Sequence, residues 1–277
     1  MSQSTLSQRG RDWFHALCGQ IPLLQGLPPS LLVADGELAG QPARYVAVVA
    51  DPHNPFERAR HGEVGLLEGW ALAATIDAVV DADQQQEHKR AIIAIIDVPS
   101  QAYGRREEAY GIHQALAAAA AAYARARLAG HPAIGLIVGK AMSGAFLAHG
   151  YQANRLLALD DAGVMVHAMG KQAAARITLR TVEELEKLAA SIAPMAYDIA
   201  SYASLGLLWR LLKAGQPDQP TPADVQLVRT ALTEALHDIQ ADPQRDLRQR
   251  LHGEHRQATR QVRALLQQQW TGNSGEK

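Results

Sequence analysis

Two apolar runs constrain the fold of this chain more than any other feature of its sequence. Ala91–Ile96 and Ala133–Val138 each consist of apolar residues and glycine alone. Such runs are typical of strands that are buried on both faces of a helix-covered sheet. The segment between them, from Arg105 to Leu128, is predicted to be one helix that Gly130 terminates. This strand–helix–strand order indicates a crossover unit of an α/β protein.

The flanking segments continue the alternation. Ala43–Ala50 is predicted to be a strand, and Gly65–Ala82 is predicted to be a helix because its apolar residues recur every three or four positions. After the second apolar run, Ala145–Tyr151 is predicted to be a short helix. It is followed by predicted strands at Arg155–Leu159 and Val164–His167. We therefore predict a layered α/β fold.

Helix signals continue toward the C-terminus. Thr181 stands three residues before Glu184, which is the spacing of a capping box. Thr221-Pro222 is a favourable helix start, and Asp242-Pro243 predicts another one. The helix that begins at Thr221 has one apolar stripe, made of Val225, Val228, Leu232, Ala235 and Ile239.

Composition and charge exclude several classes of protein. The 277 residues include 27 basic and 28 acidic side chains, for a formal net charge of −1, whereas nucleic-acid binders usually have a strong basic excess. No apolar run reaches the roughly 20 residues that span a bilayer, and the first ten residues lack the features of a secretory signal. The single cysteine, Cys18, excludes an internal disulfide. We expect a globular, cytoplasmic protein with no nucleic-acid or membrane partner.

Two loops are candidates for holding chemistry. The first is Asp97–Glu108 and the second is Gly139–Ala145, and each follows a buried strand and opens a helix. The first amide N–H groups of a helix have no internal partner, and the helix dipole favours negative charge there. Two such loops side by side could supply paired donors to an oxyanion. Either loop alone is also typical of an ordinary strand-to-helix turn.

Taken together, the two loops resemble a known family. The relevant residues are Asp97-Val98-Pro99, Tyr103-Gly104 followed by an acidic helix start, and Gly139–Ala145. Together they resemble the carboxyltransferase branch of the crotonase superfamily. Within that branch, the sequence is most similar to the gamma subunits of biotin-independent malonate decarboxylases. The similarity runs from about Leu31 to Gly215 and includes His167–Lys171 and Ala173–Thr178.

One departure bears on the choice within that branch. The alpha subunits of biotin-dependent carboxyltransferases have more glycine in the second loop, where this chain has Lys140, Ala141, Met142 and Ala145. This difference favours the decarboxylase family. The resemblance and the change of composition beyond Lys213 divide the chain into an N-terminal segment (1–30), a crotonase-like domain (31–215) and a helical C-terminal extension (216–277).

The resemblance implies a fold of repeated β-β-α units and a partnership with a homologous beta subunit. The pair would decarboxylate a malonyl thioester, carried on the phosphopantetheine-type group of an acyl-carrier protein, to the acetyl thioester and carbon dioxide. No metal or cofactor bound directly to this chain is implied. By resemblance, the oxyanion donors are backbone N–H groups at Ser143–Gly144 and at Gly104–Arg105. Two alternatives remain: an alpha-type subunit of a biotin-dependent acyl-CoA carboxyltransferase, and a non-catalytic structural subunit.

Several side chains have both a functional and a structural interpretation. A catalytic serine at Ser143 would require the nucleophile-elbow motif Gly-x-Ser-x-Gly. The sequence Ala141–Ala145 does not match this motif. Arg105 and Arg106 could bind a carboxylate or a carrier phosphate, or could lie in a solvated helix start. Glu107 and Glu108 could be general acids, and His113, His149 and His167 could be proton donors. The six arginines from Arg245 to Arg263 could form a docking surface. Each of these side chains also has a purely structural interpretation. His53 and His61 lack partners at metal-ligand spacing, and Cys18 has no activating context.

Overall fold

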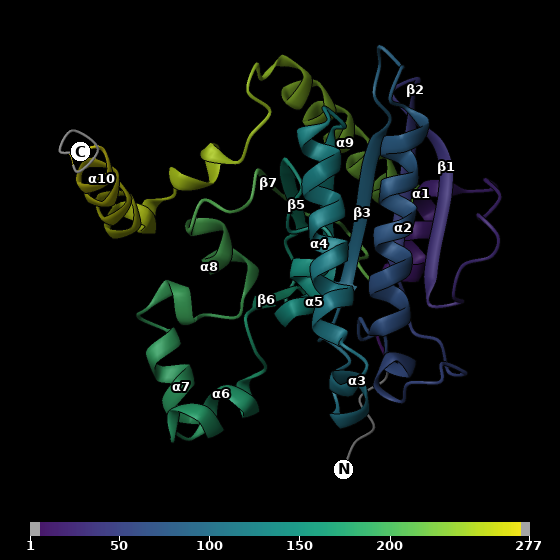
Figure 1. Ribbon diagram of the computed structural model, residues 1–277. Coiled ribbons are helices and arrows are strands. Elements are labelled where there is room, and N and C mark those ends of the chain that lie inside the picture. The colour runs from purple at the N-terminus through teal and green to yellow at the C-terminus, as the bar shows by residue number, and fades with distance from the viewer. Residues whose placement is uncertain (1–5, 273–277) are drawn as a thin grey trace.

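The computed structural model describes residues 6–272, and within them a seven-stranded sheet forms the centre of the molecule (Figure 1). Its order is β1-β2-β3-β4-β5-β7, and β6 pairs with the second half of β4. β1 is antiparallel to β2, and the other pairs are parallel. The strands are β1 (Leu31–Leu38), β2 (Gln41–Val48), β3 (Ala91–Val98), β4 (Ala133–Met142), β5 (Arg155–Leu159), β6 (Met165–His167) and β7 (Arg210–Leu212).

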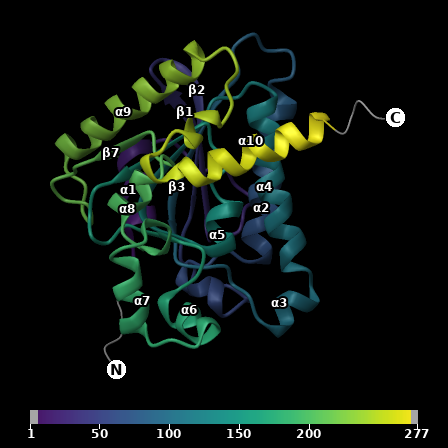
Figure 2. The same ribbon diagram turned by 90° about the vertical axis from the view of Figure 1, so that its left-hand side faces the viewer.

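Helices cover both faces of the sheet (Figures 1 and 2). One face holds α2 (Leu66–Ala82), α3 (Arg105–Ala109), α4 (Ile112–Leu128) and α5 (Ser143–Ala148), and the other holds α1 (Arg9–Cys18) and α9 (Pro222–Ala241). Beyond the β7 edge lie α6 (Lys171–Thr178), α7 (Val182–Ala189), α8 (Ile199–Ser204) and α10 (Gln257–Gly272). None of the helices within residues 6–272 combines the length and apolar character needed to cross a bilayer.

The apolar runs behave as predicted, so the α/β class is confirmed. All eight residues of β3 are buried, and β4 lies beside it in parallel register. α2 and α4 pack closely where Gly69 lies against the backbone of Ala115: an added Cβ at Gly69 would lie 2.8 Å from the Ala115 carbonyl carbon. The alanine-rich sequence of α4 therefore permits a close helix–helix approach.

Two boundaries around the candidate loops differ from the prediction. The helix predicted over Arg105–Leu128 is two helices, because Gly111 adopts φ +80° and starts α4 as a separate element. Most of the second predicted loop is strand, since Lys140–Met142 pair with Met165–His167 of β6. The loop is therefore reduced to a direct junction between β4 and α5.

Two further predictions fail at the ends of the chain. The helix start predicted at Asp242-Pro243 is wrong, because Asp242 caps the C-terminus of α9 and its Oδ1 accepts the Gln244 N–H at 3.0 Å. The chain then passes through two short 3₁₀ turns before α10. Near the N-terminus, sequence reasoning missed α1, whose Trp13 and Phe14 are fully buried, and the edge strand β1.

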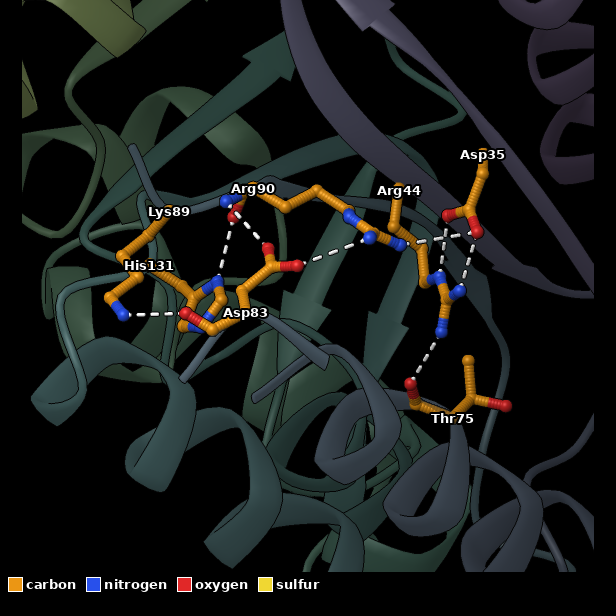
Figure 3. Close-up of polar contacts among 7 residues, drawn as sticks. All are labelled: Asp35, Arg44, Thr75, Asp83, Lys89, Arg90 and His131. Carbon is orange, nitrogen blue, oxygen red and sulfur yellow. Dashed lines mark hydrogen bonds and ion pairs between the residues drawn. The ribbon is translucent and has the colours of Figure 1, made fainter. Parts of the chain in front are cut away.

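A polar network closes the amino ends of the parallel strands, opposite the candidate loops (Figure 3). Arg44 donates two hydrogen bonds to Asp35, at 2.7 and 2.6 Å, and one to the Thr75 carbonyl at 2.8 Å. Arg90 bridges Asp35 and Asp83. Burial favours a higher pKa for Asp35, but the hydrogen bonds and charges of Arg44 and Arg90 outweigh it and lower that pKa. These paired charges hold β1, β2 and α2 together.

Candidate active site at the carboxyl ends of β3 and β4

The sheet brings the two candidate loops to one edge. β3 and β4 run parallel, and Val98 lies opposite Ala141 after a register shift at Ile96. The segments that follow the two strands therefore leave the sheet next to each other. In open α/β sheets, ligands bind outside the carboxyl ends of strands, which is where these segments lie.

A direct hydrogen bond joins the two segments. The backbone N–H of Gly144 donates to the side-chain carbonyl oxygen Oε1 of Gln101 at 3.0 Å. A Cβ added at Gly144 would collide with the same oxygen, so the glycine leaves the space that Gln101 occupies. Sequence reasoning missed Gln101, although its place inside the first loop was a usable signal. The Gly144 N–H is thus a donor that faces an oxygen atom from the first loop.

Ser143 forms the turn between β4 and α5. Its φ of +57° is in the left-handed region, which non-glycine residues rarely adopt. The preceding Met142 is still extended, with φ −116° and ψ 142°. This abrupt change turns the strand into the helix within one residue, so the amides of Ser143 and Gly144 open α5 without a connecting loop. Backbone strain of this kind often accompanies functional sites.

Asp97 anchors the same corner from inside. Its carboxylate accepts the Lys140 N–H at 3.0 Å, the Gly10 N–H at 3.2 Å and the Ser7 hydroxyl at 2.5 Å. The side chain therefore ties the end of β3 to β4 and to the start of α1. Its role is to position the junction, which sequence reasoning did not assign to it even though Asp97 begins the first motif.

Gly104 and Arg105 lie at the start of α3, as expected, but not at the contact between the loops. The buried carboxylate of Glu107 lies against the Gly104 Cα. The Arg105 side chain is exposed and, within residues 6–272, forms no ion pair or hydrogen bond. In that same part of the chain, no hydrogen bond or ion pair joins either residue to Ser143 or Gly144. The structure connects the loops through Gln101 instead, three residues before Gly104.

Of the three candidate histidines, His113 is exposed on α4, His149 lies in the core and His167 lies near the junction. His149 is fully buried and contacts the Ile95 carbonyl at 2.9 Å and the Tyr123 hydroxyl at 3.1 Å. Burial lowers the pKa of His149 to about 4, so it is a neutral structural residue at ordinary pH.

His167 lies opposite Met142 across β4 and β6, and its ring stacks on Tyr197 at a centroid distance of 3.9 Å. Burial lowers the pKa of His167 despite a hydrogen bond to the Met169 carbonyl.

Other candidate side chains have structural surroundings. The guanidinium of Arg106 lies 4.8 Å from the Phe56 ring centroid. Burial raises the pKa of the Cys18 thiol to about 12, which keeps it protonated. Among residues 6–272, no group of three His, Cys, Asp or Glu side chains is placed to hold a metal ion.

A cavity of about 880 Å³ opens near the same strand ends, toward α1. Arg11, His61, Asp97 and Lys140 contribute to its lining. Within the described part of the chain, Gln101, Ser143 and Gly144 do not line this cavity. The cavity and the Gly144 donor are therefore distinct features.

The sheet with its parallel crossovers and helix-opening junction defines a class of fold. A transcarboxylase 12S structure superposes with a TM-score of 0.62 at 18% identity, covering 82% of this chain and 41% of that one, which shows a shared carboxyltransferase fold. The predicted crotonase-like class is confirmed. More specifically, the family model described as malonate decarboxylase gamma subunit matches residues 59–270. The chain belongs to this family, which confirms the resemblance seen in the sequence.

Individual relatives agree with this assignment. A Pseudomonas malonate decarboxylase hetero-tetramer, solved with coenzyme A, contains a chain that is 67% identical, with a TM-score of 0.92 over 95% of this chain and 99% of that one. A chain of the Pseudomonas MdcD–MdcE hetero-dimer is 63% identical, with a TM-score of 0.88 over the same shares. A curated Malonomonas rubra protein, named malonyl-S-ACP:biotin-protein carboxyltransferase, is 35% identical over 164 residues. That match covers 58% of this chain and only 56% of the relative's length.

Proposed function

We propose that this chain acts with a beta subunit to decarboxylate a malonyl thioester held on an acyl-carrier protein, releasing the acetyl thioester and carbon dioxide. Its family and the subunit composition of the Pseudomonas relatives support this assignment. The observation that carries the mechanism is the Gly144 N–H, which opens α5 beside the first loop. Residues 31–215 would carry the site, and residues 216–277 would form the helical extension.

The backbone donors at Ser143–Gly144 would act on the charge that decarboxylation creates. Breaking the bond to the carboxylate leaves an electron pair, which the thioester carbonyl accepts as an enolate oxygen. Hydrogen bonds to a charged oxygen are about twice as strong as those to a neutral one. The Gly144 N–H would therefore bind the enolate oxygen more strongly than it binds the neutral amide oxygen of Gln101. The enolate then takes up one proton, which completes the acetyl group.

The partners follow from the same chemistry. The malonyl group would arrive as a thioester on the phosphopantetheine-type arm of the carrier protein, so this chain would need no cofactor of its own. The beta subunit would complete the site at its interface with this chain. We also propose that the first loop contributes backbone N–H groups at Gly104–Arg105, with the exposed Arg105 guanidinium in a secondary role.

Substitution of Gly144 tests the backbone assignment. Gly144→Val would displace Gln101 and crowd the donor, and loss of one oxyanion donor typically lowers kcat about 100- to 1000-fold. Ser143→Ala retains the amides and should lower kcat much less. Both variants would be assayed in complex with the beta subunit after sedimentation has verified assembly. Normal turnover by an intact Gly144→Val complex would refute the assignment.

A further inference from the structure

α10 has an exposed apolar face in the described chain. Every residue from Gln257 to Thr271 is exposed. Val262, Leu265 and Leu266 have exposed fractions of 55%, 49% and 60%, and their spacing places them on one side of the helix. An isolated helix of 16 residues is only marginally stable in water, because most helix stability in proteins comes from packing an apolar face. This face therefore requires a covering surface.

The charges of α10 restrict what can cover it. The helix contains Arg260 and Arg263 and no acidic residue. Four other arginines of the C-terminal segment bind within the chain: Arg245 to the Gly130 carbonyl, Arg248 to Asp246, Arg250 to the Tyr151 carbonyl and Arg256 to the Leu205 carbonyl. A second copy of α10 would supply two more arginines and no carboxylate to pair with them. A fitting surface is instead an apolar groove with acidic side chains at its rim.

The position of α10 relates this surface to the candidate active site. Figure 1 shows α10 standing away from the sheet, and Figure 2, seen from that side, shows it crossing in front of the upper part of α4, with α5 below it in the view. Elements on the same side expose further large apolar side chains, namely Leu147 of α5, Ile177 of α6 and Leu179. A protein that covers α10 would thus approach the helix that Ser143 and Gly144 begin.

We infer that the Val262–Leu265–Leu266 face of α10 docks into an apolar, acid-rimmed groove of the beta subunit. This inference rests on the proposed function, which requires that partner. The family model extends through residue 270, so α10 belongs to the part that the family shares. The matching chains that cover 95% of this one come from hetero-oligomers. Docking there would place the beta subunit over α5 and help to close the shared site.

Two aspartate substitutions on opposite sides of α10 test the inference. Leu266→Asp puts a charge on the apolar face, and Gln267→Asp puts the same charge and residue type on the polar face. With the full chain and its beta subunit, Leu266→Asp should raise the dissociation constant at least about 10-fold, because one lost apolar side chain and one buried charge both oppose binding. Gln267→Asp should change it less than about 2-fold. Leu266→Met should retain wild-type affinity.

Other occupants would give different results in the same experiment. Equal affinity of Leu266→Asp and Gln267→Asp for the beta subunit would overturn the inference. The inference would also be overturned if Leu266→Asp weakened only the self-association of this chain, or only its binding to the carrier protein. Decarboxylation is measured in parallel at saturating concentrations of wild-type subunits. Activity there, together with equal affinities of the two variants, would reject α10 docking and leave the proposed function standing.

Discussion

At the scale of single residues, the candidate chemistry depends on backbone atoms and on the side chain that faces them. Gly144 supplies an N–H and space, Ser143 supplies a left-handed turn, and Gln101 supplies the oxygen that the N–H binds. The sequence motifs identified Ser143 and Gly144. Gln101 could not be paired with Gly144 from the sequence, because the pairing depends on the register shift between β3 and β4.

Gln101 should compete with substrate for the Gly144 donor. Gln101→Ala removes the competing oxygen, and a typical hydrogen bond has a net value of about 0.5–1.5 kcal/mol. We therefore expect KM for the malonyl thioester to fall about 2- to 10-fold, with a smaller change in kcat. Steady-state kinetics of the assembled complex measures this, with Gln114→Ala on the exposed side of α4 as the control. A lower kcat at unchanged KM would instead indicate that Gln101 stabilises the transition state.

At the scale of elements, prediction succeeded where local patterns agree with packing. The runs of β3 and β4 are buried, and so is the stripe of α9 apart from the half-buried Val225. The Thr181 capping box forms, and α9 starts at Thr221-Pro222 as predicted. Prediction failed where tertiary pairing decides. Lys140–Met142 read as loop because their strand partner, β6, lies more than twenty residues further along the chain. Gly111 looked like one residue of a long helix, but its positive φ divides it.

The close approach of α2 and α4 is a testable property of these elements. Gly69→Ala would bring a Cβ within 2.9 Å of the Ala115 Cβ and carbonyl oxygen, and backbone cannot move aside as a side chain can. Overpacking of this kind costs about 1–3 kcal/mol of unfolding free energy. Thermal unfolding should therefore occur at a clearly lower temperature. Gly170→Ala is the control, since nothing lies within 4 Å of its added Cβ, and an equal Tm for both variants would contradict tight packing.

At the scale of the whole molecule, the chain presents its candidate donors and the exposed helix α10 on one side. α5 begins at the end of β4, and α10 stands outside it (Figure 2). The apolar residues of α10 are exposed, and the chain belongs to a family whose Pseudomonas members were solved as hetero-oligomers. These features fit a subunit that contributes half of a shared site. A scaffold subunit would need no ordered donor at Gly144.

The most direct test measures decarboxylation of a malonyl thioester by this chain alone, by the beta subunit alone and by their mixture. Each assay is run both with and without avidin, which sequesters biotin. A shared site predicts that carbon dioxide is released only by the mixture and at the same rate with or without avidin. Full activity of the beta subunit alone would contradict the account and reduce this chain to a scaffold, and inhibition by avidin would favour a biotin-dependent carboxyltransferase.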